Sequence, residues 1–525
     1  MCGILFVEGQ VDQTTFLASF EKIHHRGPDM SRILTHELGT FGFHRLAIMD
    51  VTEHGMQPFI DGQITAVCNG EIYNEHAIKA DFPDYPFQGH SDCEVLIPMY
   101  ERYGIDMARL LDAEFAFVIT DLGAKKIIAA RDPIGIRPLF YGYQKASGKI
   151  AFASEAKALI ELCSEVHPFP IGSIYDNGTF IRYTDITKTD KPKLTSQAQI
   201  KREIREKLTA GVQKRMMSDV PVGYLLSGGL DSSLVCAIAA RSSDKPLTTF
   251  AIGMKEDAID LKYARIVANH LKSDHHEIIM TIDDVMEALP EVIRMLETYD
   301  ITTIRASLGM YLLCKGIRKV SDIKVLLSGE ISDELFGYKY TDFAPSPEAF
   351  QIESEKRLRE LYEYDVLRAD RCIAAWSLEA RVPFGDLDFV STVLAIDPAL
   401  KMNTRKMGKY WLRAAFEEGD YLPESILWRD KAAFSDAVGH SMVDALKAKA
   451  EALYSDVTFE LGKRKYEDIP PISKEALWYR DLFETFYPKQ SHWISDYWMP
   501  NKQWEGCAVN DPSARVLSNY GLSGV

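Results

Sequence analysis

The stretch Pro221–Ser233, PVGYLLSGGLDSS, decides the fold of the second half of the chain. An apolar run leads through two adjacent glycines into a serine-rich turn, which predicts a strand over Pro221–Leu226 and a helix over Ser233–Ala240. The glycines Gly228 and Gly229 allow a tight turn and leave room for a ligand. Backbone N–H groups at the start of a helix, together with serine hydroxyls, favour an anion. The stretch therefore predicts a phosphate-binding loop.

Asp231 is the unusual member of this loop, because its carboxylate would repel a phosphate unless a cation lies between them. Mg²⁺ that bridges Asp231 to phosphate oxygens removes the conflict. The other interpretation is a glycine-rich turn in which Asp231 or Ser232 only caps the helix. The loop lacks the Gly-Lys-Ser/Thr ending of a Walker loop, so we expect a different class of phosphate site.

The sequence around this loop repeats an order of apolar strand, turn and helix. Strands are predicted at Val220–Leu226, Thr248–Ile252 and Ile323–Leu327, with a helix around Leu261–Leu271. A further helix is predicted from apolar residues that recur every four positions between Ile200 and Met216. This order is typical of a parallel sheet covered by helices, an α/β domain.

The first ~185 residues have a different pattern, with short apolar runs between turns. Strands are predicted at Thr40–Val51, Ile64–Cys68, Phe115–Asp121, Ile127–Ala130 and Ile150–Ala153, and one helical stretch at Asp92–Tyr103. The polar, proline-containing segment Thr184–Ser196 is interpreted as a linker. We therefore predict domains at 1–190 and 191–500, followed by a mobile C-terminal tail at 501–525.

Composition narrows the function. The 525 residues carry a formal net charge of −16, which argues against general nucleic-acid affinity. No run approaches the ~20 apolar residues that span a bilayer, and the N-terminus does not resemble a secretory signal. The eight cysteines are scattered without a Cys-x-x-Cys pair, which suits reduced thiols in the cytoplasm.

Cys2 follows the initiator methionine directly. If Met1 is removed, Cys2 carries both a thiol and a free α-amine, which titrates near pH ~8 and is able to accept the thiol proton. A Met-Cys start alone is weak support for catalysis, because an inert thiol is the common case. Whether Cys2 is catalytic therefore depends on which residues accompany it.

Matching segments over almost the whole length resemble the glutamine-dependent asparagine synthetases of the bacterial B type. In the first half they are His25–Asp29, His44–Leu46, Asn69–Asn74, Ser91–Glu94, Phe115–Phe117, Arg131–Pro133, Arg137–Tyr141 and Ala153–Glu155. With Cys2 they resemble a class II amidotransferase glutaminase domain, which implies an α+β N-terminal-nucleophile (αββα) fold. The loop Ser227–Ser233 resembles the pyrophosphate loop of the ATP-pyrophosphatase superfamily, whose members cleave ATP between the α- and β-phosphates.

The chemistry of glutamine hydrolysis fits the matched residues. Cys2 would be the nucleophile, and the Asn69 amide with the Gly70 N–H would bind the oxyanion. Arg45 suits the α-carboxylate of glutamine, and Glu71 and Asp92 suit its α-ammonium group. Singly, Asn69-Gly70 is also a plausible hairpin turn and Asp92 a plausible helix N-cap.

The resemblance implies further roles in the second half. Thr302, Thr303 and Arg305 match the segment that binds aspartate, although Arg305 also suits a surface ion pair. Glu330 matches the acid/base group for ammonia, and Asp333 joins Asp231 as a Mg²⁺ ligand. The ATP-binding positions are Leu225, Ser227, Gly228, Gly229, Asp231, Ser232, Ser233, Ile252, Ser328, Gly329 and Lys431. Leu225 and Ile252 also suit strand core, and Lys431 a solvated charge.

The chain departs from the family at Ile331, where the usual loop reads Ser-Gly-Glu-Gly-Ser-Asp-Glu, and at a single glycine, Gly337, before Tyr338. If position 331 requires a positive φ, a β-branched residue would be strained by roughly 1–2 kcal/mol or more. The loop is then expected to follow a different path, which weakens the roles of Glu330 and Asp333.

The sequence thus predicts a cytoplasmic ligase with two active sites and substrates glutamine, aspartate and Mg²⁺-ATP, and the resemblance implies a homodimer. One rival is an adenylating synthetase for another carboxylate, such as a lactam synthetase, whose glutaminase domain lacks the nucleophile. The other, motivated by Ile331, is a regulatory or assembly-forming relative with reduced activity.

Overall fold

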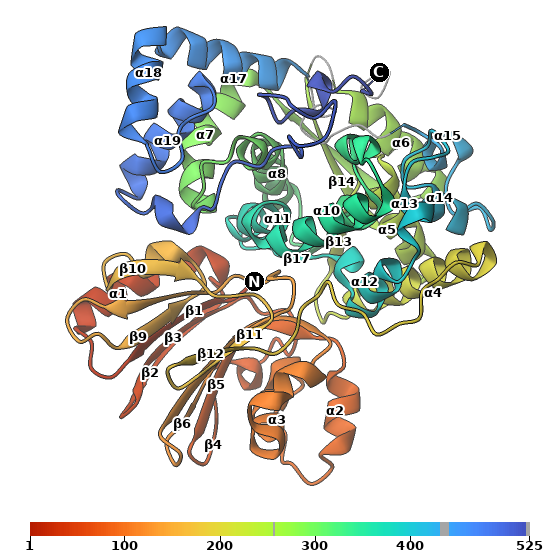
Figure 1. Cartoon of the computed structure of the whole chain (residues 1–525). Helices are drawn as coiled ribbons and strands as arrows, with labels where there is room; N and C mark the ends of the chain where they lie inside the picture. The colour runs from red at the N-terminus through yellow and green to blue at the C-terminus, as the bar shows by residue number, and fades with distance from the viewer. Residues whose placement is uncertain (256–257, 431–439, 521–525) are drawn as a thin grey trace.

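The chain folds into two domains, the first built on two antiparallel sheets and the second on a parallel sheet (Figure 1). The structure is a computed structural model, and it describes residues 1–255, 258–430 and 440–520. Residues 184–196 connect the domains without a helix, and only Leu194 forms an isolated bridge, with Ile396. This segment has the irregular structure expected of a linker.

The first domain is a sandwich of two six-stranded antiparallel sheets. One sheet has the order β10-β8-β9-β1-β3-β2 and the other β12-β11-β7-β6-β5-β4. The strands of the first sheet are β1 (Gly3–Glu8), β2 (Met30–His36), β3 (Gly39–Arg45), β8 (Phe140–Gln144), β9 (Ile150–Ala153) and β10 (Cys163–Pro168). Those of the second are β4 (Phe59–Asp61), β5 (Ile64–Ile72), β6 (Ala113–Asp121), β7 (Lys126–Arg131), β11 (Ser173–Asp176) and β12 (Thr179–Arg182).

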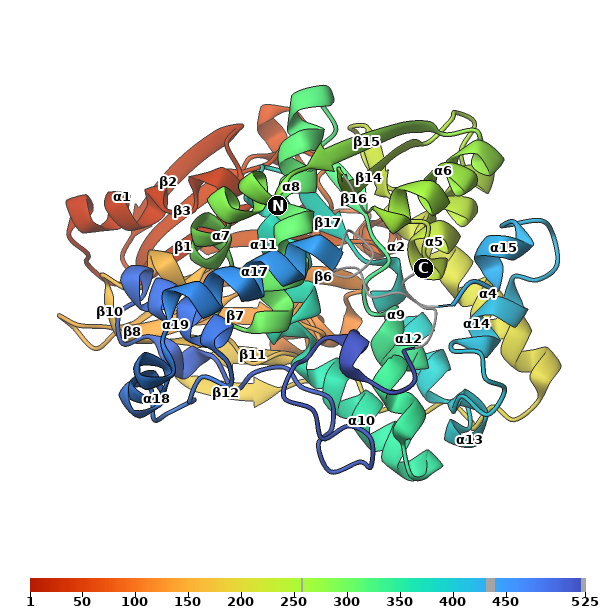
Figure 2. The same cartoon turned by 90° about the horizontal axis from the view of Figure 1, so that it is seen from above.

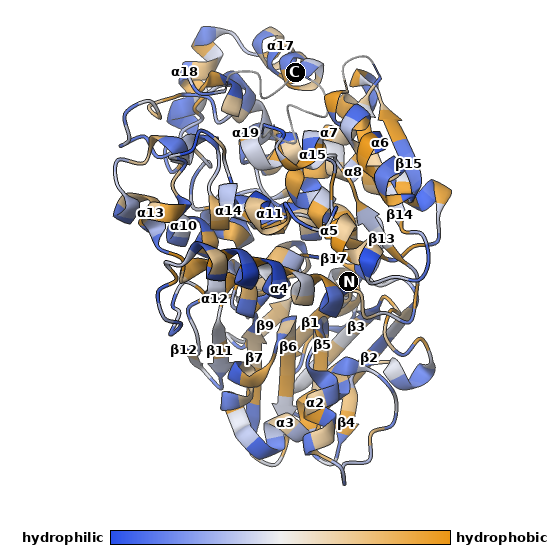
Figure 3. Cartoon of the chain, turned by 90° about the vertical axis from the view of Figure 1, so that its right-hand side faces the viewer, coloured by the Kyte–Doolittle hydropathy of each residue, from blue (hydrophilic) through white to orange (hydrophobic). Residues whose placement is uncertain are grey.

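Alternating residues of each strand fill the space between the two sheets. Ile4 and Phe6 of β1 pack with Val67 of β5 and Val118 of β6, while Leu5 and Val7 face the other way. Figure 3 shows the hydrophobic character of β5 and β6 in the middle of this domain. The outer faces are covered by α1 (Gln13–Glu21) on one side and by α2 (Glu75–Asp81) and α3 (Leu96–Tyr103) on the other. The predicted αββα fold is confirmed.

The second domain has a five-stranded parallel sheet of order β15-β14-β13-β16-β17. Its strands are β13 (Val222–Leu225), β14 (Thr248–Met254), β15 (Asp274–Met280), β16 (Val325–Leu327) and β17 (Glu379–Arg381). The first strand, β13, is central, and the chain then builds outward on both sides. The order therefore reverses between β13 and β16, and ligands bind beyond the carboxyl ends of strands at such a switch point.

Helices cover both faces of this sheet, as predicted. The described helices of this domain are α4 (Gln197–Arg215), α5 (Leu230–Arg241), α6 (Ile259–Leu271), α7 (Ile282–Leu296), α8 (Ile301–Val320), α9 (Ser332–Phe336), α10 (Pro347–Glu360), α11 (Asp365–Ala374), α12 (Leu387–Leu394), α13 (Pro398–Lys401), α14 (Tyr410–Ala415), α15 (Glu424–Leu427), α17 (His440–Leu453), α18 (Asp456–Lys465) and α19 (Lys474–Phe486). In the described part of the chain, no helix is long and apolar enough to cross a membrane.

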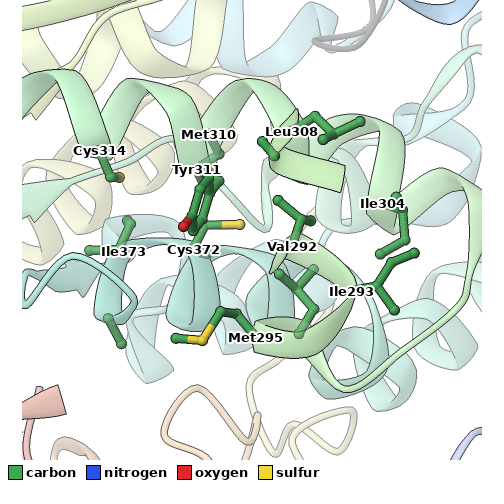
Figure 4. Close-up of a cluster of buried hydrophobic side chains, with 14 of the residues drawn as sticks. Val292, Ile293, Met295, Ile304, Leu308, Met310, Tyr311, Cys314, Cys372 and Ile373 are labelled. Atoms are coloured by element: carbon green, nitrogen blue, oxygen red, sulfur yellow. The ribbon is translucent and has the colours of Figure 1, made fainter. Parts of the chain in front are cut away.

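The core on one side of the sheet joins α7, α8 and α11 (Figure 4). Val292 of α7, Leu308 and Cys314 of α8, and Cys372 and Ile373 of α11 are all buried there. Because interiors of this kind are close-packed, these three helices form one rigid layer.

A buried group of charges lies where the two domains meet. Arg381 of β17 contacts Glu71 of the first domain, with 2.9 Å between Nη2 and Oε1. Arg215 of α4 donates to Glu114 of β6 over 2.7 Å. Burial opposes the ionisation of Glu379, but Arg137 and Arg381 hold its pKa down to about 2. Residues of the edge strand β17 therefore make ionic contacts between the parallel sheet and the first domain.

The C-terminal residues 501–520 are packed, in place of the mobile tail that their composition predicts. Trp504, Cys507 and Leu517 are buried in a cluster with Tyr340 and Phe350. The dark-blue segment lies beside α10 (Figure 2), where Asn501 donates to Glu353 over 3.0 Å. Buried aromatic and apolar side chains outweigh the absence of regular structure in this segment.

Candidate active sites

The sandwich of the first domain brings Cys2 and Asn69 together at one end of the two sheets. The backbone N of Cys2 donates to Asn69 Oδ1 over 2.9 Å, across 67 residues of sequence. Asn69 is only 1% exposed, and its Nδ2 has no hydrogen-bond partner. A buried amide donor without a partner is costly unless a ligand accepts its hydrogen bond. Asn69 Nδ2 is therefore suited to an oxyanion beside Cys2.

Met1 is present and fully buried ahead of Cys2. Its terminal amine lies 3.7 Å from a carboxylate oxygen of Glu379, and burial lowers the pKa of this amine to about 6. Burial also raises the pKa of the Cys2 thiol to about 11. With Met1 in place, Cys2 thus has a protonated thiol and an α-nitrogen that is part of a peptide bond.

Arg45, at the end of β3, points its guanidinium at the loop that follows. It donates to the carbonyl oxygens of Thr52, over 2.6 Å, of Met49, over 3.2 Å, and of Asp50. Neutral carbonyl oxygens hold the Arg45 guanidinium in place and carry no formal charge of their own. This arrangement suits a site for the carboxylate of a small substrate.

Glu71 and Asp92 lie near each other and are both buried. Burial raises the pKa of Glu71 well above its ordinary value even though Arg381 opposes the shift, and Glu71 Oε2 has no hydrogen-bond partner. Burial also raises the pKa of Asp92, whose carboxylate accepts from the backbone N of Ile72 over 2.7 Å.

These contacts decide between the alternatives left open by the sequence. Asn69 and Gly70 lie inside strand β5, not in a hairpin turn. Asp92 is the first residue of a short 3₁₀ turn whose N-cap is Ser91, and its carboxylate fastens the end of β5.

The second site lies beyond the carboxyl ends of β13 and β16, at the switch point of the parallel sheet. The loop after β13 turns at Gly228, where φ is +74° and an added Cβ would lie 2.4 Å from the backbone N of Ala264. Helix α5 begins at Leu230, so the prediction of Ser233 as its first residue is wrong by three positions. Asp231 and Ser232 therefore lie in the first turn, the part of a helix that favours an anion.

The loop after β16 contains the departure from the family pattern. Ile331 has φ 80° and ψ −19°, the left-handed region that favours glycine. Position 331 therefore has the positive φ on which the expectation of strain depended, and the isoleucine carries that strain. Ser332 still reaches Asp231, with 2.8 Å between Oγ and Oδ1, so the two loops remain joined.

Lys409 lies between the two loops, and the sequence did not identify it. Its Nζ is 2.8 Å from Asp231 Oδ1 and 2.6 Å from Asp333 Oδ1. Lys409 is buried and has φ 58°, so its backbone too is in the left-handed region. Strain of this kind is typical of functional sites. No pattern in the surrounding sequence reports it, because the contact spans 178 residues.

Asp231 and Asp333 are the candidate ligands of a magnesium ion. Two carboxylates from different loops approach one cationic group, which is a donor set that Mg²⁺ accepts. Among the described residues, no group of three or more metal-ligating side chains converges anywhere. Mg²⁺ sites in nucleotide enzymes commonly use one or two carboxylates with phosphate oxygens and water, so the pair fits.

A cavity of about 230 Å³ lies against both loops. Its lining includes the predicted ATP-binding residues Leu225, Ser227, Gly229, Asp231, Ser232, Ile252, Ser328 and Gly329, together with Glu330 and Asp333. Ser328 Oγ is buried and has no hydrogen-bond partner. Gly228 and Ser233 are not part of the lining, and Lys431 lies outside the described residues.

Glu330 contacts Arg368 of α11, with 2.5 Å between Oε2 and Nη2. Burial raises the pKa of Glu330, and Arg368 opposes that shift. Arg368 also lines the cavity and was not identified from the sequence.

The residues matched to aspartate binding divide into three different environments. Thr302 lines the cavity, and its buried Oγ1 has no partner. Thr303 instead donates to Asp300 over 2.8 Å at the start of α8 and is not part of the lining. Arg305 lines the cavity but forms ion pairs with Glu475 and Asp511, over 2.6 and 3.1 Å. The ion-pair interpretation of Arg305 holds, although the pair is buried and not at the surface.

Comparisons with known proteins agree with this architecture. A family model described as asparagine synthase matches residues 203–351 and 344–510, and one described as a glutamine amidotransferase domain matches 1–185. The chain is 43% identical to the probable glutamine-hydrolysing asparagine synthetase of Schizosaccharomyces pombe, over 99% of each chain. It is 42% identical to glutamine-hydrolysing asparagine synthetase 1 of Saccharomyces cerevisiae, over 98% of each chain. The enzyme of that name from Cricetulus griseus is 40% identical over 99% of each chain.

Proposed function

The chain belongs to the family of glutamine-hydrolysing asparagine synthetases, and from this we propose which of its residues carry out the two half-reactions. The enzyme amidates aspartate to asparagine at the expense of ATP, with glutamine as the nitrogen donor. The observation that carries the assignment is the hydrogen bond from the Cys2 backbone N to Asn69 Oδ1, which leaves Asn69 Nδ2 beside Cys2 without a partner.

At the first site, Cys2 attacks the side-chain amide of glutamine after Met1 has been removed. Only then is the α-amine of Cys2 free to accept the thiol proton. Asn69 Nδ2 and the Gly70 N–H stabilise the tetrahedral oxyanion, which collapses to a glutamyl thioester and releases ammonia. Water hydrolyses the thioester to glutamate. Arg45 holds the α-carboxylate of glutamine, while Glu71 and Asp92 hold its α-ammonium group.

At the second site, the β-carboxylate of aspartate attacks the α-phosphorus of ATP, giving β-aspartyl-AMP and pyrophosphate. Ammonia then attacks this mixed anhydride, giving asparagine and AMP. The loop Ser227–Ser233 holds the phosphates, and Thr302 supplies a donor for aspartate. Glu330 accepts a proton from the attacking ammonia. Asp231 and Asp333 would hold Mg²⁺, which neutralises phosphate charge when it is bound.

Two observations favour this function over the rival functions. An intact set of Cys2, Arg45 and Asn69 favours an ammonia-using enzyme over a lactam-type synthetase. The approach of both Asp231 and Asp333 to Lys409 disfavours a regulatory relative with reduced activity.

A pyrophosphate-release assay tests the acceptor. Release from Mg²⁺-ATP that depends on aspartate supports the proposal. Release with another carboxylic acid alone would favour the lactam-type rival, and no release with any acid would favour the regulatory one. Amino-acid analysis after incubation with glutamine, aspartate and Mg²⁺-ATP identifies the product.

The oligomer, the compartment and the subtype are finer proposals. We propose a cytoplasmic homodimer of the bacterial B subtype, supported by the free state of all eight cysteines and by the family resemblance. Light scattering of the purified protein tests the dimer.

A further inference from the structure

One helix of the second domain reaches toward both active sites. Asp370 of α11 accepts two hydrogen bonds from Arg26 of the first domain, over 2.8 and 3.1 Å. Arg26 in turn donates from Nε to the backbone carbonyl oxygen of Cys2 over 2.9 Å. Two positions before Asp370, Arg368 contacts Glu330 over 2.5 Å. Each of these polar contacts is direct.

The two side chains leave the helix in opposite directions. Successive residues of an α-helix are rotated by about 100°, so positions 368 and 370 point about 200° apart. Arg368 therefore faces the ATP-side cavity, while Asp370 faces the first domain. Arg368 and Asp370 lie within one turn of α11. This turn therefore connects the contacts that lead to the Cys2 carbonyl group with the contact to the Glu330 carboxylate.

Burial makes these ion pairs costly to break. Arg26 is 0% exposed, Asp370 2% and Arg368 8%. A buried charge that loses its partner is strongly destabilised. If Arg26 moves, Asp370 must therefore move with it, and if Arg368 moves, so must Glu330. The bidentate Arg26–Asp370 pair also fixes orientation as well as distance.

Helix α11 is anchored in the core of the second domain by its own apolar residues. Cys372 and Ile373 anchor α11 in the core with α7 and α8 (Figure 4). Arg371 adds contacts to Glu155 of the first domain and to Glu297 after α7, each over 3.0 Å. Ion-pair and hydrogen-bond networks joined by a rigid element are the kind of connection that carries coupling between sites.

We propose that α11 couples the two active sites, with Asp370 and Arg368 as the positioning residues on its opposite sides. Occupation of the glutamine site moves the Cys2 carbonyl and Arg26, and α11 transmits the change to Glu330 through Arg368. Because coupling is reciprocal, ATP and aspartate at the second site alter the affinity of the first site for glutamine. This inference rests on the assignment of Cys2 and Glu330 to the two sites.

The test measures glutamine binding by titration calorimetry in a Cys2→Ala background, which does not hydrolyse the ligand. The dissociation constant is measured alone and with saturating α,β-methylene-ATP, Mg²⁺ and aspartate. We expect the two constants to differ by at least about five-fold. In Asp370→Asn the ratio falls to within about two-fold, because the neutral amide no longer pairs with both guanidinium nitrogens.

Arg26 keeps its second carboxylate, Glu155, at 2.7 Å, so Asp370→Asn is expected to fold. Arg368→Lys tests the contact with Glu330 independently and should reduce the same ratio of dissociation constants. The matched control is Asp112→Asn, which breaks another ion pair between the domains, with Lys214 at 2.6 Å. That variant should retain the coupling ratio.

An equal glutamine affinity with and without the second-site ligands, while both sets bind, would overturn the coupling but leave the proposed function intact. So would an unchanged ratio in Asp370→Asn and Arg368→Lys. Failure of the Cys2→Ala background to bind glutamine at all would overturn the site assignment, and the coupling with it.

Discussion

Several single residues of this enzyme show their function through an unpaired buried polar atom or a strained backbone conformation. The Nδ2 of Asn69 is buried with no partner, and Ile331 and Lys409 have left-handed backbones. Burial and strain of this kind cost stability and persist where a ligand or a reaction needs them. Each of these three residues lies at one of the two sites.

Asn69→Ala removes the amide donor while leaving Cys2 in place. We expect the glutamine-dependent kcat to fall by about 10²–10³-fold, the usual loss for one oxyanion donor. Ammonia-dependent synthesis in the same protein preparation is the control and should stay within about two-fold. Equal losses in both steady-state assays would contradict the oxyanion role.

Ile331 and Gly385 form a matched pair. A Cβ added at Gly385 would lie 2.8 Å from Ile331 Cδ1, so the isoleucine occupies the space that the glycine leaves. We expect Ile331→Gly to relieve strain but to lose more through the cavity, a net destabilisation of about 1–3 kcal/mol.

Gly385→Leu alone should also destabilise, by about 1–3 kcal/mol, because it collides with Ile331. The double variant Ile331→Gly/Gly385→Leu should lose less stability than the two single variants lose together. Denaturant unfolding measures all four proteins, and strict additivity would show that the two residues do not share this space.

At the scale of elements, local patterns predicted the strands and loops well where one signal dominated. Strand β9 occupies Ile150–Ala153 as predicted, and the phosphate loop does follow β13. Helix α5 begins three residues earlier than predicted, since no residue before Ser233 breaks the helix once the loop has turned at Gly228.

The partners of the site residues could not be predicted in the same way. Lys409 meets Asp231 across 178 residues, and Arg305 meets Asp511 across 206. Such pairs depend on how the elements pack, and no local periodicity records them. The Cys2–Asn69 pair was expected only because a whole set of family segments matched.

The loop between β13 and α5 provides a test at this scale. Gly228→Ala adds a Cβ within 2.4 Å of backbone at a positive φ, so we expect a stability loss of about 2–4 kcal/mol and a raised KM for ATP. Gly229→Ala is the structural contrast, since its nearest atom would be Ser227 Oγ at 3.3 Å. Its thermal unfolding should change much less. Similar unfolding temperatures for both variants would contradict this account of the turn.

At the scale of the whole molecule, distant segments complete the second site. Residues 501–520 pack on α10, and Pro512, Ser513 and Ala514 line the cavity. Asp511 pairs with Arg305, which holds the pKa of Asp511 well below its usual range despite partial burial. The lowered pKa means that this pair stabilises the fold at neutral pH and is lost only in strong acid.

Asp511→Asn should therefore loosen the C-terminal segment at neutral pH. We expect a loss of about 1–2 kcal/mol, because Arg305 keeps Glu475, and faster proteolysis near residue 511. The stability difference from the unsubstituted enzyme should shrink as the pH falls below the ordinary aspartate range. A difference that is constant down to pH ~2 would contradict the role of the pair.

The separation of the two reactions is the central claim, and Cys2→Ala tests it most directly. Asparagine formation from aspartate and Mg²⁺-ATP is measured with glutamine and, separately, with ammonium. The account predicts that the glutamine-dependent rate disappears while the ammonium-dependent rate stays within about two-fold, because Cys2 lies in one domain and the ATP cavity in the other. Asparagine formation from glutamine by the Cys2→Ala enzyme would contradict it.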